Sequence, residues 1–178
     1  MILWFKHLPH RSMNFSEWTP FIQNDWFRKH YMKFVYLLML LFVLTPIWLK
    51  GSLDFIEDIP LLPIFILIFI LHEILHIMVV YTKGDISLTF KGVYFWLHTD
   101  AELSKTRFWV FMSLPLIGLS IIPGVAAFFV PGGTVQSLLF SISWINLIIS
   151  SSDVINSILI LFKPRRAVFC RGYYQVER

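Results

Sequence analysis

Two histidines and a glutamate stand close together in the order His72-Glu73-Ile74-Leu75-His76. Residues i and i+4 of an α-helix lie on the same face, so the two imidazoles can reach one ion. This spacing is typical of a zinc hydrolase site, in which two histidines hold the metal and the glutamate takes a proton from water. The motif therefore predicts that His72 and His76 bind Zn²⁺ and that Glu73 is the catalytic base.

The surroundings of the motif argue against a chance match. It lies inside an apolar run over residues 61–80, and an ionisable group at the centre of a membrane helix costs about 2.5–3.5 kcal/mol on insertion scales. Such a group persists where it has a partner or a function. Two structural alternatives are a buried polar cluster between helices and a histidine pair that ligates haem. Neither alternative needs Glu73 between the two histidines.

The composition is that of an integral membrane protein. Of the 178 residues, 57% are hydrophobic and 15% are charged, and the mean hydropathy is +0.69; a soluble domain of this size needs far less apolar surface. The net charge of +4 comes from basic residues that flank apolar segments, which indicates a lipid bilayer as the partner and no nucleic acid. The single cysteine, Cys170, excludes an intramolecular disulfide and a cysteine-based zinc site, so histidine and carboxylate must hold a metal.

Four apolar runs predict an all-α membrane protein with four transmembrane helices and a short β-hairpin between the second and the third. The helices are expected at about residues 34–49, 61–81, 108–130 and 135–162. Residues 1–33 mix aromatic and basic side chains and are predicted as an N-terminal interfacial segment. The predicted organisation is completed by a four-helix zinc peptidase domain over 34–162 and a basic C-terminal tail over 163–178.

Prolines and glycines indicate irregular helices. Pro46 is expected to kink the first helix or to end it. Pro115, Gly118 and the pair Pro123-Gly124 are expected to kink or unwind the third helix, which a membrane tolerates where protein or a water-filled cavity satisfies the freed backbone groups. Close packing between helices would explain the small residues equally well.

The polar stretch between the second and third helices is predicted to form a β-hairpin. Residues 85–90 alternate between polar and apolar, Lys91-Gly92 provides a turn, and residues 93–98 favour a strand. The exposed edge of such a hairpin could pair with an extended substrate, or the hairpin is only a connection. The sequence does not decide between the two.

The fourth predicted helix carries a polar stripe. Its members follow one another at intervals of three and four: Ser143, Asn146, Ser150, Asp153 and Ser157. Asp153 is the one acid of this helix, and a zinc ion held by two histidines lacks its usual third protein ligand, so we predict that Asp153 completes the site. Asn146 shares its face and is predicted to bind substrate or an oxyanion. In the alternative, Asp153 accepts a hydrogen bond from a ligand histidine while Asn146 or His98 binds the metal.

Flanking charge predicts the orientation. Basic residues cluster before the first helix, between the second and third, and after the fourth, whereas the loop over residues 50–60 is acidic. The positive-inside rule then predicts a multi-pass protein of the cell membrane with both termini in the cytoplasm. His76 and Asp153 would lie in the cytoplasmic halves of two oppositely directed helices.

The motif helix, the hairpin, the proline-bearing third helix and the stretch 146–153 (NLIISSSD) resemble the zincin-like bacterial membrane peptidases. That family is distantly similar to the site-two proteases, which are intramembrane zinc metalloproteases. The resemblance covers about residues 61–162. It implies that His72, His76 and Asp153 are metal ligands and that Glu73 is the base.

The aspartate motif departs from the site-two protease pattern. That pattern has a leucine before and a glycine after the aspartate, where this chain has Ser152 and Val154, and its asparagine stands one residue further away. The departure concerns the handling of substrate more than the binding of metal.

These features predict a zinc-dependent membrane metallopeptidase that hydrolyses peptide bonds in membrane-embedded or juxtamembrane protein segments. The alternative is a non-catalytic metal-binding membrane protein, such as an immunity or chaperone-like partner. Glu73 distinguishes them, because a structural metal site needs no base. A membrane di-iron oxidase would need further histidine clusters, which the remaining histidines do not form: His7, His10, His30 and His98.

Overall fold

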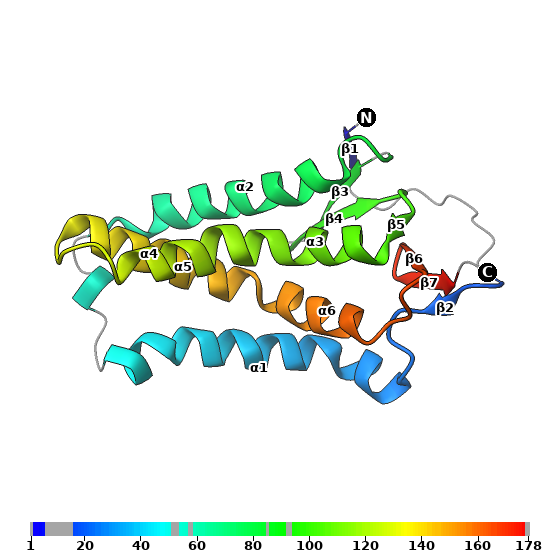
Figure 1. Ribbon diagram of the computed structural model, residues 1–178, viewed down its shortest axis with the longest axis horizontal. Helices are drawn as coiled ribbons and strands as arrows, with labels where there is room; N and C mark the ends of the chain where they lie inside the picture. The colour runs from blue at the N-terminus through cyan, green and yellow to red at the C-terminus, as the bar shows by residue number, and fades with distance from the viewer. Residues whose placement is uncertain are drawn as a thin grey trace.

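The computed structural model describes residues 2–5, 16–50, 54–56, 59–84, 86–91 and 94–176. Helices run side by side along the long axis, and two small sheets lie at one end of the bundle, where both ends of the chain also lie (Figure 1). The α-helices are α1 (Asp25–Lys50), α2 (Leu61–Val80), α3 (Lys105–Leu116), α4 (Ile122–Ala127), α5 (Thr134–Ile149) and α6 (Ser151–Leu161). A short 3₁₀ segment, η1 (Asp54–Ile56), follows α1, and a π-helical segment, η2 (Ile117–Ile121), joins α3 to α4.

Three helical segments are long and apolar enough to cross a membrane: Asp25–Trp48, Leu61–Val80 and Lys105–Ala127. The fourth expected span is not one straight helix. It consists of α5 and α6, which meet at an angle of 64°. The described residues therefore support three spans, or four if the bent pair crosses as one.

Helix α1 begins at Asp25, well before the apolar run from which a start near residue 34 is predicted. The side chain of Asn24 accepts a hydrogen bond from the Phe27 N–H at 2.8 Å, which caps the first turn. Asp25 and Arg28 form an exposed ion pair at 2.6 Å. The aromatic and basic residues 25–33 thus belong to the helix.

Pro46 lies within α1 and does not end it. Proline has no N–H, so the carbonyl of Phe42 lacks its usual partner within the helix. The indole Nε1 of Trp144 on α5 donates to this carbonyl at 3.0 Å. The proline therefore creates an acceptor through which α5 contacts α1.

The predicted interruption of the third span is confirmed, because η2 begins two residues after Pro115. Pro115 has no N–H for the carbonyl of Phe111, four residues before it. Side chains of α5 donate to two other carbonyls of this region: Asn146 Nδ2 to Pro115 O at 2.9 Å and Ser143 Oγ to Ser120 O at 2.8 Å. Gly124 permits the close approach of α4 to α5, since a Cβ there would lie 2.7 Å from Ser143 Oγ.

The prediction of one continuous fourth helix over 135–162 is wrong, because the chain bends at Ser150. Residues 146–154 contain neither proline nor glycine. The Ser151 hydroxyl competes for a backbone carbonyl instead, because its Oγ donates to Ile148 O at 2.7 Å. Ser150 Oγ accepts from the side chain of Asn146 through Nδ2 at 3.2 Å. Beyond the bend, Tyr31 of α1 hydrogen-bonds to α6 through Ser152 O at 3.3 Å and Asn156 Oδ1 at 3.0 Å.

Two small sheets cover one end of the bundle. The predicted hairpin is present as β3 (Ile86–Lys91) and β4 (Tyr94–Thr99), and β1 (Ile2–Phe5) pairs in parallel with β3. The second sheet has the order β2-β7-β6-β5, formed by Thr19–Pro20, Tyr173–Val176, Ala167–Cys170 and Leu103–Ser104. Within the predicted C-terminal tail, residues 167–176 therefore form a hairpin, with left-handed backbone at Arg171 and Gly172 (φ 45° and 81°).

Candidate metal centre

Helix α2 presents His72 and His76 to the interior of the bundle, where they are only 3% and 6% exposed. His72 Nδ1 lies 2.9 Å from Asn146 Oδ1, and His76 Nδ1 lies 2.7 Å from the Phe111 carbonyl oxygen. Both of these oxygens can only accept, so the hydrogen-bond network assigns the proton of each ring to Nδ1. Each Nε2 is then left with a free lone pair.

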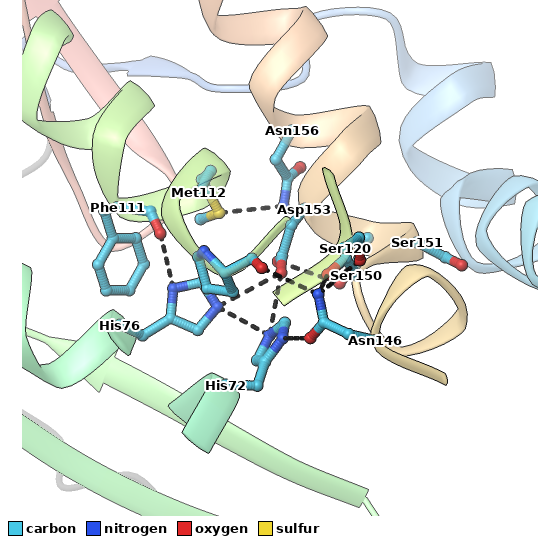
Figure 2. A network of polar contacts seen from close by, with 12 residues as sticks. His72, His76, Phe111, Met112, Ser120, Asn146, Ser150, Ser151, Asp153 and Asn156 are labelled. Atoms are coloured by element: carbon cyan, nitrogen blue, oxygen red, sulfur yellow. Dashed lines mark hydrogen bonds and ion pairs between the residues drawn. The ribbon is translucent and has the colours of Figure 1, made fainter. Parts of the chain in front are cut away.

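The two Nε2 atoms both lie next to the carboxylate of Asp153, as Figure 2 shows. His72 Nε2 and His76 Nε2 are 3.1 Å apart, and they lie 3.1 Å and 3.3 Å from Asp153 Oδ2. In a tetrahedral zinc site with bonds of about 2.0–2.2 Å, neighbouring ligand atoms are about 3.3–3.6 Å apart. The three atoms thus form a triangle close to one face of a zinc tetrahedron.

The chemistry of these atoms also fits a cation. Asp153 is 7% exposed, and its Oδ2 has no hydrogen-bond partner among the described residues. With both histidine protons on Nδ1, three acceptors face one another without a donor between them, which is costly for buried polar atoms. A metal ion at their centre would satisfy all three. In the described part of the chain, this is the one group of three histidine, cysteine or acidic residues that could hold a metal.

The bend at Ser150 positions Asp153 for this contact. Asp153 lies in the first turn of α6, where the chain has turned away from the axis of α5. Asn146 lies before the bend, on α5, and contacts His72. The two helices therefore bring one carboxylate and one carboxamide to the same histidine from different directions.

Asn146 is fully buried, and both its oxygen and its nitrogen form hydrogen bonds. Besides accepting from His72, it donates through Nδ2 to Pro115 O at 2.9 Å, Ser120 Oγ at 2.8 Å and Ser150 Oγ at 3.2 Å. A contact with substrate, as predicted from the sequence, would require one of these bonds to open. What the structure shows directly is that Asn146 orients the ring of His72.

Glu73 is half-buried beside His72 and lies outside the triangle. A group in this position is near the centre without being part of the ligand cluster, as the sequence motif predicts.

Among the other histidines, only the side chain of His30 is described, and it does not join the site. His30 lies on the exposed side of α1, with Nδ1 2.8 Å from the Trp26 carbonyl. His7, His10 and the side chain of His98 lie outside the described residues. The alternative with Asn146 on the metal receives no support, because its oxygen faces His72 Nδ1 and not the Nε2 atoms.

Sequence reasoning assigned no role to three groups that support the centre. The Phe111 carbonyl orients His76, and the hydroxyls of Ser120 and Ser150 hold Asn146. The sequence held a signal for the Phe111 carbonyl, because Pro115, four residues later, has no N–H to donate to it. Ser150 was visible as part of the polar stripe, whereas Ser120 stood in the irregular third span without a recognisable pattern.

Comparison with known proteins identifies the family. Residues 65–168 match a family model with the description "Putative zincin peptidase", and the chain belongs to this family. The matched region includes all of the residues that build the centre described above. No curated protein and no solved structure matches the chain. Family membership indicates a zinc-dependent peptidase.

Proposed function

We propose that the protein is a zinc-dependent membrane metallopeptidase that hydrolyses peptide bonds in membrane-embedded or juxtamembrane segments of other proteins. One observation carries the proposal: two imidazole nitrogens and one carboxylate oxygen, all buried, converge with free lone pairs and no donor between them. Three protein ligands with a fourth position left for water are typical of catalytic rather than structural zinc sites. The family of the chain supports the same chemistry.

In this proposal His72, His76 and Asp153 hold the metal. Zinc bound there would act as a Lewis acid, which would polarise the substrate carbonyl and lower the pKa of a bound water. Asn146 and the Phe111 carbonyl keep the two imidazoles in the tautomer that directs Nε2 to the metal. These two contacts also fix the orientation of the rings before a metal binds.

In this proposal Glu73 is the general base. Its carboxylate accepts a proton from the attacking water and passes it to the amine of the departing peptide. The position of Glu73, next to a ligand on α2 but outside the ligand triangle, suits this role. A non-catalytic metal-binding protein, such as an immunity or chaperone-like partner, would not need a carboxylate there.

The substrate class follows from the depth of the site. His72 and His76 lie in α2, and Asp153 lies in the bent pair α5–α6, so a substrate peptide must reach a centre that lies among apolar helices. Segments within the bilayer or directly beside it meet this condition. We further propose a multi-pass protein of the cell membrane with both termini in the cytoplasm. Flanking basic residues support this orientation, as does the presence of both chain ends at one end of the bundle (Figure 1).

Two measurements test the proposal. Bound zinc is measured in protein purified in detergent, and cleavage is measured in cells that co-express the peptidase with other membrane proteins. The parent should retain zinc and cleave, Glu73→Gln should retain zinc without cleaving, and His72→Ala should lose both. Equal cleavage by the parent and Glu73→Gln would refute the proposed mechanism.

A further inference from the structure

A pocket of about 300 Å³ lies between α3 and the four-stranded sheet. Its aromatic lining comes from five residues: Phe21, Phe108, Phe111, Phe169 and Tyr173. The ring of Phe108 lies 5.7 Å from that of Phe21 and 4.8 Å from that of Phe169, measured between centroids. Since these rings pack against one another, the pocket is a preformed part of the fold.

Phe111 and Met112 join this pocket to the metal centre. The ring of Phe111 lies 4.7 Å from the ring of His76, and the Phe111 carbonyl accepts a hydrogen bond from His76 Nδ1. Met112 contacts Asn156, which lies one turn after Asp153 on α6 (Figure 2). A peptide whose scissile carbonyl lay at the metal centre would therefore bring a neighbouring side chain to this pocket.

The lining favours an uncharged apolar occupant. Arg171 is the one cationic residue that lines the pocket, and it is paired with Asp100, whose Oδ1 accepts from Arg171 Nε at 2.6 Å. A cationic side chain would lose its hydration there, because the lining offers it Arg171 and no carboxylate. The volume is at the lower end for ligand sites, about 300–1,000 Å³, which suits one large side chain rather than a cofactor.

Asn156 provides a polar contact at the wall of the pocket. Its Oδ1 accepts from Tyr31 at 3.0 Å. Its Nδ2 donates to the Met112 sulfur at 3.8 Å, and among the described residues this weak acceptor is its recorded partner. The amide can therefore donate to a stronger acceptor, such as a peptide carbonyl, at little cost.

We propose that this pocket binds a large, uncharged apolar side chain of the substrate next to the scissile bond, and that Asn156 Nδ2 donates to the substrate backbone. The inference rests on the proposed peptidase function, because the metal centre must hold the peptide. It adds a sequence preference: cleavage beside an aromatic or large aliphatic residue and not beside a lysine or arginine.

Hydroxamates test this preference by binding alone, since the hydroxamate group binds zinc and the side chain explores the pocket. The probes are acetohydroxamate and the hydroxamates of glycine, phenylalanine and lysine, titrated calorimetrically into zinc-loaded protein in detergent. Phenylalanine hydroxamate should bind about tenfold or more tightly than glycine hydroxamate, as expected for burial of a phenyl ring. Lysine hydroxamate should show no such gain.

A variant that enlarges the pocket provides a gain that misfolding cannot produce. Met112→Ala removes a lining side chain, so 2-naphthylalanine hydroxamate should gain about tenfold relative to phenylalanine hydroxamate. Met32→Ala, on the exposed side of α1, should leave this ratio unchanged.

The possible failures are distinct. If acetohydroxamate does not bind zinc-loaded parent protein, the metal site and the peptidase proposal fail, and the pocket inference fails with them. If acetohydroxamate binds but phenylalanine and glycine hydroxamates bind equally, or Met112→Ala leaves the ratio unchanged, the pocket inference alone is wrong.

Discussion

Replacing Asn146 by leucine, which has a similar shape, tests how this amide contributes to zinc affinity and, separately, to the stability of the fold. The substitution removes the acceptor of the His72 Nδ1–H, which lies 2.9 Å away, so the ring loses its fixed orientation. Loss of such a partner typically costs 10–100-fold in metal affinity, or about 1.4–2.7 kcal/mol. The Pro115 carbonyl also loses its donor at 2.9 Å, which lowers the free energy of unfolding by about 1–3 kcal/mol.

Two measurements determine the two effects separately. Competition for zinc with a chelating dye gives the zinc affinity, and equilibrium unfolding in mixed micelles gives the free energy of unfolding. Gln136→Leu is the matched control on the same helix, because Gln136 Nε2 donates to Ala127 O at 2.9 Å and to Val130 O at 3.1 Å without contacting a histidine. The control should lose stability and keep the zinc affinity of the parent. An Asn146→Leu protein that binds zinc as tightly as the parent would refute the argument that this amide orients His72.

Three further predictions concern the base, the orientation and the packing of α1. Glu73→Gln should bind zinc with the affinity of the parent and abolish cleavage; loss of zinc would instead make Glu73 part of the metal site. A membrane-impermeant maleimide should label Asp54→Cys and spare Glu17→Cys in intact cells, and the reverse would invert the proposed topology. Burial raises the pKa of the Cys170 thiol, which therefore stays protonated at neutral pH and gives little background labelling. Tyr31→Phe should lower the free energy of unfolding by about 1 kcal/mol through the lost bonds to Ser152 and Asn156, whereas Tyr81→Phe, exposed at the end of α2, should change nothing.

Helix periodicity and membrane thickness explain what the sequence predicted well. The spacing of His72 and His76 places both on one face of any helix, and an acid within an apolar span turns toward the protein interior. These two local rules bring His72, His76 and Asp153 together without knowledge of the tertiary structure. The β3–β4 hairpin and the irregular backbone after Pro115 were likewise predictable from local signals.

Local signals could not predict the bend between α5 and α6. The segment contains neither proline nor glycine, and its serines fit a polar stripe on a straight helix equally well. Tertiary contacts support the bend from both sides: Asn146 donates to Pro115 O and Ser120 Oγ before it, and Tyr31 donates to Ser152 O after it. The C-terminal hairpin was missed for a similar reason, because its strands are short and pair with residues 19–20 and 103–104, far away in the sequence.

The central claim is that His72, His76 and Asp153 hold one zinc ion. Zinc-edge X-ray absorption of the purified protein, compared with Asp153→Asn, tests it most directly. The account predicts two imidazole nitrogens at about 2.0–2.1 Å and oxygen at about 2.0–2.2 Å, with zinc sharply depleted in Asp153→Asn. A spectrum without two imidazoles, or one that is the same in Asp153→Asn at full zinc occupancy, would contradict it.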